Sequence, residues 1–282
     1  TETNGVYMVS VSNGTIEDSE ITLIAGYPFY ISDCRDVSIL SNSIVNNSYY
    51  YNAFLDPEGL IGMYISADWG VSYRLHIANN IISNYSNGEY FGIGIYFDAW
   101  DSIIEYNTIS DDYRGMTMGY TFNNIVRYNT FSGFNYWGEG GPGGFPGTDP
   151  WGDHFCLIVE PGGSSGNNLF YGNAFLDSLH YAYDNKVANN WNGTSFGNYW
   201  EGYSDVDSNG DGCWDTPYIL EGGVQDNFPL MANPNQSPVR GPITINSDAD
   251  FTPANGVSAG DGSAGSPWVI QNWLIDPDGD AH

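Results

Sequence analysis

A six-residue pattern of apolar and polar positions recurs along the first two thirds of the chain. Each copy has an apolar residue, two further residues, an Asn, one residue and a second apolar residue. A weaker copy at residues 16–21 carries Ser19 instead of Asn, and clear copies lie at residues 39–44, 77–82, 104–109, 126–131 and 170–175. Such self-similarity at intervals of 20–50 residues predicts stacked supersecondary units rather than one globular core.

The spacing of the copies fits a solenoid. Intervals of 22 to 27 residues suit one turn, whereas the intervals of 38 and 44 suit one turn plus an insertion, or two turns of which one has lost the pattern. The units are rich in Ile, Val, Tyr, Ser and Thr, which favour strands. Stacking such strands in register would place the asparagines in a ladder of side-chain amides formed by Asn42, Asn80, Asn107, Asn129 and Asn173.

These features predict an all-β fold, a parallel β-helix. The alternative is an antiparallel β-sandwich, which also has short strands and frequent turns. A sandwich does not require an Asn at one recurring position, so we favour the β-helix. We expect β-helical coils over residues 1–184, a Trp- and Gly-rich cap over 185–232, and a linker with a strand segment over 233–282.

Charge limits the partners of this chain. Lys and Arg total 6 against 34 Asp and Glu, which gives a formal net charge of −28. Such a surface repels nucleic acid and anionic lipid, so we expect neither as a partner. No apolar run reaches the ~18 residues of a membrane span, so we expect no membrane insertion. The chain opens on TETNGVYM without a signal peptide, and we interpret it as a mature or excised segment of an extracellular, cell-surface protein.

The cysteines allow two interpretations. Cys34, Cys156 and Cys213 are odd in number, so in an extracellular protein at least one thiol stays free or pairs between chains. A disulfide between subunits is therefore one hypothesis for these residues. Three buried residues acting as small hydrophobes is the other, because free Cys is among the most buried residue types.

An acidic loop is the sharpest local motif. Residues 205–215 read DVDSNGDGCWD, and this spacing of oxygen-bearing side chains around a Gly resembles the first half of a calcium loop. We expect a structural Ca²⁺ that braces the cap. The alternative is an acidic turn held by side-chain to backbone hydrogen bonds. The five predicted ligands are Asp205, Asp207, Asn209, Asp211 and Asp215.

The sequence does not predict a catalytic centre. A glycosidase needs two carboxyl groups about 5–10 Å apart. Glu105, Asp111, Asp112 and Asp153 are candidates, but in so acidic a chain some acids are always adjacent by chance. Aromatic residues crowd the repeats, for example at Tyr49–Tyr51 and Tyr96–Phe97. We expect them to form stacked structural ladders, with a sugar-binding platform as the alternative.

The repeats, together with GNYWEGYSDVDSNGDGCWDTPYIL at 197–220 and DNFPLM at 226–231, resemble a right-handed parallel β-helix family. Its type member is the periplasmic copper-processing protein of nitrous oxide reductase maturation, and many archaeal surface-layer-like proteins carry the same module. The resemblance covers nearly the whole chain and implies a right-handed coil. The sequence has no Met/His cluster that would suit copper. Segment 243–275 resembles the beginning of the module, and we expect strands at Ile243–Asn246 and Trp268–Ile275.

The order of these parts suggests how chains assemble. If one chain's C-terminus led into the next chain's N-terminus, Ile275 and Ile21 would be 28 residues apart, close to one turn. We therefore expect a head-to-tail homopolymer by strand donation, as an envelope sheath, surface layer or filament. A segment cut from a longer tandem array is the competing explanation. The alternative function is a secreted polysaccharide lyase, hydrolase or carbohydrate-binding protein. The proposed subunit-completing strand uses Trp268, Ile270, Trp273 and Ile275.

Overall fold

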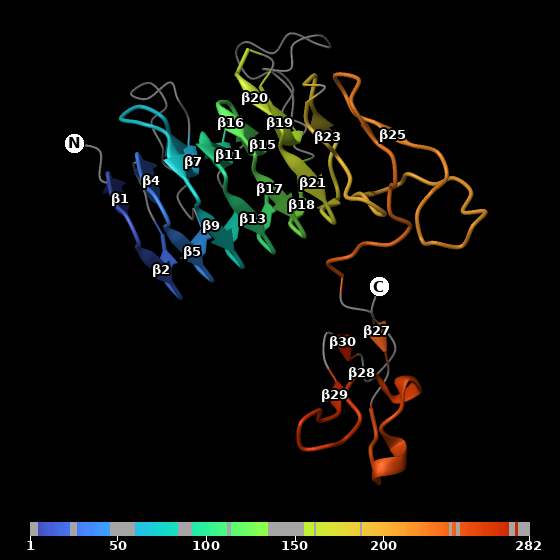
Figure 1. Ribbon diagram of the computed structural model, residues 1–282. Helices are drawn as coiled ribbons and strands as arrows, with labels where there is room; N and C mark the ends of the chain where they lie inside the picture. Colours follow the sequence, from blue (N-terminus) through green and yellow to red (C-terminus); the bar gives the residue numbers. More distant parts are fainter. Residues whose placement is uncertain are drawn as a thin grey trace. The chain divides into compact units, whose positions relative to one another are not determined.

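The computed structural model describes residues 5–22, 27–45, 60–83, 92–111, 114–134, 155–160, 162–186, 188–236, 239–240, 243–270 and 274–275. The chain divides into two compact units, Thr1–Asn235 and Gln236–His282. In unit 1 the strands stack coil upon coil along the chain (Figure 1). The Gly- and Pro-rich stretch 138–153 lies outside the described residues.

Four parallel sheets run along unit 1, and each coil adds one strand to most of them. Sheet A has the order β1 (Val6–Val9), β4 (Phe29–Ser32), β7 (Leu60–Ser66), β11 (Gly92–Phe97), β15 (Arg114–Met118), β19 (Phe155–Val159) and β23 (His180–Tyr183). Sheet B has β8 (Ser72–Tyr73), β12 (Ala99–Trp100), β16 (Thr121–Phe122) and β20 (Ser165–Gly166).

The repeated pattern supplies the other two sheets. Sheet C contains β2 (Thr15–Glu17), β5 (Ser38–Leu40), β9 (His76–Ala78), β13 (Ile103–Glu105), β17 (Ile125–Arg127) and β21 (Leu169–Tyr171). Sheet D contains β3 (Glu20–Ile21), β6 (Ser43–Val45), β10 (Ile81–Ser83), β14 (Thr108–Ser110), β18 (Thr130–Ser132), β22 (Ala174–Phe175) and β24 (Tyr199–Trp200). All strand pairs in these sheets are parallel, so the predicted parallel β-helix is confirmed and the sandwich is wrong.

The register follows the sequence pattern. The first apolar residues of the copies stack on one another, as Ile39 does on Ile77 and Ile77 on Ile104, and these side chains are buried. Val126 stacks directly on Phe170, so the 44-residue interval is one turn plus an insertion. The inward residues of all four sheets fill one continuous apolar core inside the coil.

Each repeat bends sharply between its sheet C and sheet D strands. The residue before the ladder position takes a left-handed conformation in every copy, with φ from 50° at Asp18 to 66° at Gly172. Glycine tolerates this backbone freely, whereas Tyr106 and Tyr128 occupy it at a steric cost. Their rings stack 5.2 Å apart and offset part of that cost.

Residues 185–232 continue the coil rather than forming a separate body. Strand β24 pairs with β22, and the buried ring of Trp200 stacks on Phe175 at 4.5 Å. Trp191 is also buried and stacks on Phe170 at 4.2 Å. A small antiparallel pair, β25 (Tyr218–Ile219) with β26 (Gln225–Asp226), follows.

Unit 2 contains only short elements. Strand β27 (Val239–Arg240) pairs with β30 (Leu274–Ile275), and β28 (Val257–Ala259) pairs with β29 (Val269–Ile270). Two single 3-10 turns, η1 (Asp248–Asp250) and η2 (Pro253–Asn255), lie between β27 and β28.

Two strand predictions in this unit need correction. Residues 243–246 form no strand, because the Asp250 carboxylate accepts the backbone N–H groups of Asn246 and Ser247, both at 2.8 Å. The expected strand Trp268–Ile275 is replaced by β29 and β30, which pair with different partners.

Candidate functional site

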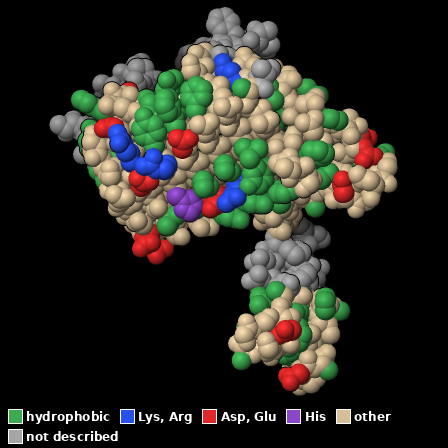
Figure 2. All heavy atoms as spheres, viewed as in Figure 1, with side chains coloured by type: hydrophobic (Ala, Val, Ile, Leu, Met, Phe, Trp, Pro, Cys, Tyr) green, Lys and Arg blue, Asp and Glu red, His purple; other side chains and the backbone are tan. Residues whose placement is uncertain are grey.

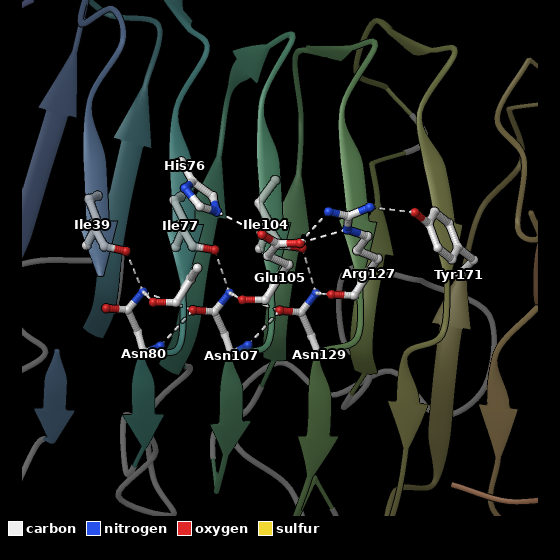
Figure 3. A network of polar contacts seen from close by, with 11 residues as sticks. Ile39, His76, Ile77, Asn80, Ile104, Glu105, Asn107, Arg127, Asn129 and Tyr171 are labelled. Atoms are coloured by element: carbon white, nitrogen blue, oxygen red, sulfur yellow. Dashed lines mark hydrogen bonds and ion pairs between the residues drawn. The ribbon is translucent and has the colours of Figure 1, made fainter. Parts of the chain in front are cut away.

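A ladder of asparagine side chains runs through the core side of unit 1 (Figure 3). At each rung the Asn backbone N–H and its Nδ2 both donate to Oδ1 of the Asn in the next coil. Asn80 donates to Asn107 at 3.0 and 2.9 Å, and Asn107 donates to Asn129 at 3.0 and 2.9 Å. The bonds from Asn42 to Asn80 and from Asn129 to Asn173 repeat this geometry.

The second Nδ2 hydrogen of each rung bonds to a backbone carbonyl of the preceding coil. Asn107 Nδ2 donates to the Ile77 carbonyl at 2.9 Å, and Asn129 Nδ2 donates to the Ile104 carbonyl at 2.9 Å. Each amide thus joins three coils and leaves no donor unused. Burying a polar group is costly unless it is hydrogen-bonded. The ladder bonds satisfy the asparagine side chains and so allow them to be buried inside the turns.

The ladder extends beyond the residues expected from the repeat. Asn173 donates to Asn198 Oδ1 at 3.1 and 2.9 Å, and Asn198 in turn donates its backbone N–H to Asp226 Oδ2 at 2.7 Å. The signal was present in the sequence, because Asn198-Tyr199-Trp200 repeats the Asn-x-apolar half of the pattern.

A second ladder, which sequence reasoning missed, runs through the turn between sheets B and C. Ser102 N–H donates to Asn124 Oδ1 at 2.9 Å, Asn124 Nδ2 to Asn168 Oδ1 at 2.9 Å, and Asn168 Nδ2 to Asn189 Oδ1 at 3.2 Å. Asn189 Nδ2 then donates to Asp184 Oδ2 at 3.0 Å. In the sequence, the signal is a polar residue two positions before the first apolar residue of three copies, those that begin at Ile104, Val126 and Phe170.

Both ladders end at a buried aspartate. Every Asn rung needs an acceptor in the next coil, whereas an ionised Asp only accepts and needs nothing beyond it. Burial is the largest influence on both carboxyl groups and raises the pKa of Asp226 to about 6 and that of Asp184 in the same direction. The residue type therefore explains why each row stops where it does.

On the outside of sheet C, a polar chain crosses four coils (Figure 3). Glu105 contacts His76 at 2.9 Å and Arg127 at 2.7 Å, and Arg127 Nη1 donates to the Tyr171 hydroxyl at 2.9 Å. Burial alone would raise the pKa of Glu105, but the bonds from His76 and Arg127 lower it overall. Glu105, a carboxylate considered for catalysis, is thus held by its neighbours.

Hydrophobic side chains gather in separate patches on the face viewed in Figure 2. Outside the core, aromatic residues form rows that follow the coil spacing. Trp100 lies 5.6 Å from Tyr73 and 5.6 Å from Phe122, edge to face with both. These rings pack on one another, as expected for a structural ladder.

The acidic loop is closed on itself. Asp215 N–H donates to the Val206 carbonyl at 2.8 Å, and Ser208 N–H donates to Asp215 Oδ2 at 3.0 Å. Asp207 accepts the N–H groups of Gly210 and Gly212 at 2.7 and 3.1 Å. Among the described residues, no three His, Cys, Asp or Glu side chains are gathered as a metal site.

The loop nevertheless carries a donor set that suits calcium. Asn209 Oδ1 accepts the Asp211 N–H at 2.9 Å, and Asp211 Oδ1 accepts the Cys213 N–H at 2.9 Å. Asp205 is exposed on the same loop. A hard cation prefers such carboxylate and amide oxygens, and the closed loop keeps them on eleven consecutive residues.

The three cysteines are free and buried. Burial raises the pKa of each thiol, at Cys34, Cys156 and Cys213, and so disfavours the reactive thiolate. A disulfide between subunits requires sulfur at the surface. The structure therefore favours the alternative in which all three act as small core residues.

The predicted subunit-completing residues lie in unit 2. Trp268 stacks on Phe251 at 5.9 Å, and Ile270 is in β29 and exposed. Ile275 ends β30, whereas Trp273 lies outside the described residues. No described helix is long and apolar enough to span a membrane.

A family model described as a right-handed beta helix region matches residues 3–192. The chain belongs to this family. The match starts before β1 and covers the whole second ladder and the first ladder as far as Asn173, and it establishes the predicted handedness of the coil. No curated protein matches the chain.

Proposed function

We propose that this β-helix protein is a structural component of an extracellular cell envelope, as a sheath, surface layer or filament subunit. Its units would assemble head to tail, with unit 2 of one copy completing the coil of the next. The observation that supports this most is a difference between the two ends of unit 1. The C-terminal side is sealed with aromatic rings and acceptor-only aspartates, and the N-terminal side is not.

The first described coil has an open edge. Among the described residues no strand pairs with the outer side of β1, β2 or β3. Met8, Ile16 and Ile21 pack against the core but remain partly exposed, unlike the corresponding buried residues of later coils. An edge with unpaired backbone groups and apolar side chains is a template for another strand.

Unit 2 lacks a buried core among its described residues. Between residues 243 and 270 the only buried residue among those described is Gly256. Ile270, with 36% of its surface exposed, lies on β29, and among the described strands β28 alone pairs with it. A segment of short strands without a core gains stability by adding to the sheet edge of a larger body.

Calcium has a bracing role in this proposal. The loop that would hold it, residues 205–215, comes soon after β24. The residues that flank the loop are joined, because the Tyr203 hydroxyl donates to the Thr216 carbonyl at 3.0 Å. An ion held by the loop would stabilise the sealed end. Its charge would also offset part of the net charge of −28.

Light scattering after size exclusion, over a range of concentrations, tests the assembly. We expect species that grow with concentration for the full chain, and loss of growth in Ile16→Arg, which places a charge on the open edge. Ile219→Arg is the matched control, because Ile219 is 58% exposed and away from that edge. Circular dichroism checks that both variants fold. A monomer at every concentration, or equal assembly by Ile16→Arg, rejects the proposal.

A further inference from the structure

Asn–Gly pairs are chemically labile positions, and this chain contains several. In such a pair the backbone nitrogen of the glycine can attack the side-chain carbonyl carbon of the asparagine, because glycine has no Cβ to hinder the approach. Whether a pair reacts in the folded chain depends on how firmly the asparagine amide and the glycine N–H are held. The pairs whose two residues are both described are Asn13-Gly14, Asn192-Gly193, Asn209-Gly210 and Asn255-Gly256.

Hydrogen bonds hold three of these four pairs. At residues 192–193, 209–210 and 255–256, the asparagine Nδ2 and the glycine N–H each donate a hydrogen bond of between 2.7 and 3.0 Å. Asn209 Nδ2, for example, donates to Asp211 Oδ2 at 2.9 Å. Gly210 N–H donates to Asp207 Oδ1 at 2.7 Å. Attack by the glycine nitrogen requires both groups to turn toward each other, so these bonds must break first.

Asn13-Gly14 is the exception. Asn13 is exposed, and among the described residues neither its side chain nor the Gly14 N–H makes a hydrogen bond. The repeat explains why. In later coils the residue at the place of Gly14 donates its N–H to a side chain of the second ladder, as Asn124 does to Asn168 Oδ1 at 3.0 Å. The corresponding residue in the coil after Gly14 is Val37, whose side chain offers no acceptor.

The pair also lies where the coil is held on one side alone. Asn13 has a left-handed backbone with φ of 59°, two residues before β2. Its N–H donates to the Arg35 carbonyl at 3.0 Å, and the Gly14 carbonyl accepts the Ser38 N–H at 2.9 Å. Both bonds join it to the next coil, and among the described residues no strand pairs with the other side of β2. Segments at such an edge open locally at a lower free energy than the interior of a stack.

We propose that Asn13 is a self-modifying site, which loses its amide while the protein is folded. The Gly14 nitrogen forms a bond to Asn13 Cγ, the bond from Cγ to Nδ2 breaks, and ammonia leaves with the proton of the Gly14 N–H. Water from the solvent then opens the resulting succinimide ring. Opening at one carbonyl leaves an aspartate at position 13, and opening at the other leaves an isoaspartate. Water is the co-reactant, and no group is oxidised or reduced.

The isoaspartate product alters the first described coil most. Its backbone runs through Cγ and is one carbon longer, so the hydrogen bonds to Arg35 and from Ser38 cannot both keep their register. Either product also adds a carboxylate to a coil that already carries Glu17 and Asp18. A copy aged in this way should dock a neighbour at its first coil more weakly than a fresh copy. This consequence rests on the assembly proposed above, whereas the reaction itself does not.

Peptide mapping by mass spectrometry tests the site on the full chain, incubated in mildly alkaline buffer. It measures how fast each asparagine becomes a carboxyl group, and an isoaspartate methyltransferase assay identifies the isoaspartate. We expect Asn13 to convert about tenfold or more faster than the other three asparagines, because two hydrogen bonds hold each of those pairs. In the urea-unfolded chain all four should convert at similar rates, since the bonds that distinguish them are absent.

Gly14→Ala is the matched variant. A Cβ at Gly14 would lie 3.4 Å from Met8 Cε, an ordinary contact, so the variant should fold. The same Cβ hinders the attacking nitrogen and should slow conversion at Asn13. Two results overturn the proposal. One is a folded chain in which Asn13 converts no faster than the three bonded asparagines, and the other is an unchanged rate in Gly14→Ala.

Light scattering of fresh and aged chains tests the consequence for assembly. Aged wild type should assemble less than fresh wild type, and aged Gly14→Ala should keep its assembly. Equal assembly of fresh and aged wild type overturns the consequence. A fresh chain that stays monomeric rejects the assembly instead, and the peptide map still decides on the reaction at Asn13.

Discussion

The indole Nε1 of Trp200 donates a hydrogen bond to Oδ2 of Asp226 at 3.0 Å, and Trp191 donates in the same way to Asp184 at 2.8 Å. Each pair joins the end of an asparagine ladder to a ring that covers the last layer of the core. The two ladders, in different turns of the coil, thus end by the same chemistry. The row ends at an aspartate because its carboxylate only accepts hydrogen bonds. A tryptophan indole N–H then donates to that same carboxylate.

Replacing the terminal acid should destabilise unit 1. In Asp226→Asn an amide N–H₂ would face the Phe228 N–H, which now donates to Asp226 Oδ1 at 3.0 Å. Two donors would then oppose each other in a buried site, at a cost of about 1–3 kcal/mol. Urea unfolding measures this cost, with Asp18→Asn as the exposed control. Equal stability of the two variants would show that Asp226 does not end the ladder in the way described.

Asp226 should also give unit 1 a characteristic pH dependence. Burial raises the pKa of Asp226 to about 6 from its usual value of 3.8, so the folded state binds the proton more tightly than the unfolded chain. The associated stability is fully present below about pH 4 and is lost as pH rises through about 6, amounting to roughly 3 kcal/mol. Because other carboxyl groups titrate too, the quantity to measure is the difference in unfolding free energy between the wild type and Asp226→Asn. A difference that does not change between pH 4 and 7 contradicts this assignment.

A rung inside the ladder should matter more than an exposed asparagine. Asn107→Ala removes the acceptor of two bonds from Asn80 and the Nδ2 group that donates to the Ile77 carbonyl. We expect a loss of at least about 3 kcal/mol in unfolding free energy. Asn123→Ala, at an exposed turn position with φ of 58°, should cost about 1 kcal/mol or less. Chemical denaturation measures the unfolding free energy of both variants. Similar losses in the two would mean that the ladder contributes little to stability.

Calcium should raise the melting temperature if the acidic loop binds it. An ion at a hundred times its dissociation constant stabilises the folded state by about 2.7 kcal/mol. Differential scanning calorimetry with and without a chelator should show the shift, and Asp207→Asn combined with Asp211→Asn should abolish it. A wild type that melts at one temperature in both conditions would leave the loop as a turn held by its own backbone bonds.

The repeat could be predicted from sequence because Asn forms the same ladder hydrogen bonds in successive coils. Asn107 and Asn129 sit at one offset from buried apolar residues, and that regularity is visible without a structure. Asp226 could not be predicted so easily, because it reaches Asn198 from a different part of the chain and occurs once. Its role depends on which coil is last.

Asp98 and Glu160, which stack on either side of Gly119 in neighbouring coils, show a second limit of prediction from sequence. Insertions make the coils unequal in length, so the distance between Asp98 and Glu160 in the sequence does not reveal that both stack on the coil of Gly119. The acids chosen from sequence were instead Glu105, Asp111, Asp112 and Asp153. Glu105 is bound by His76 and Arg127, Asp111 is exposed, and the other two lie outside the described residues.

Negative-stain electron microscopy of the full chain tests the central claim, head-to-tail assembly, most directly. The account predicts regular rings, tubes or filaments that loosen when calcium is chelated and are absent in Ile16→Arg. Dispersed single particles of the wild type, with and without chelator, would contradict it.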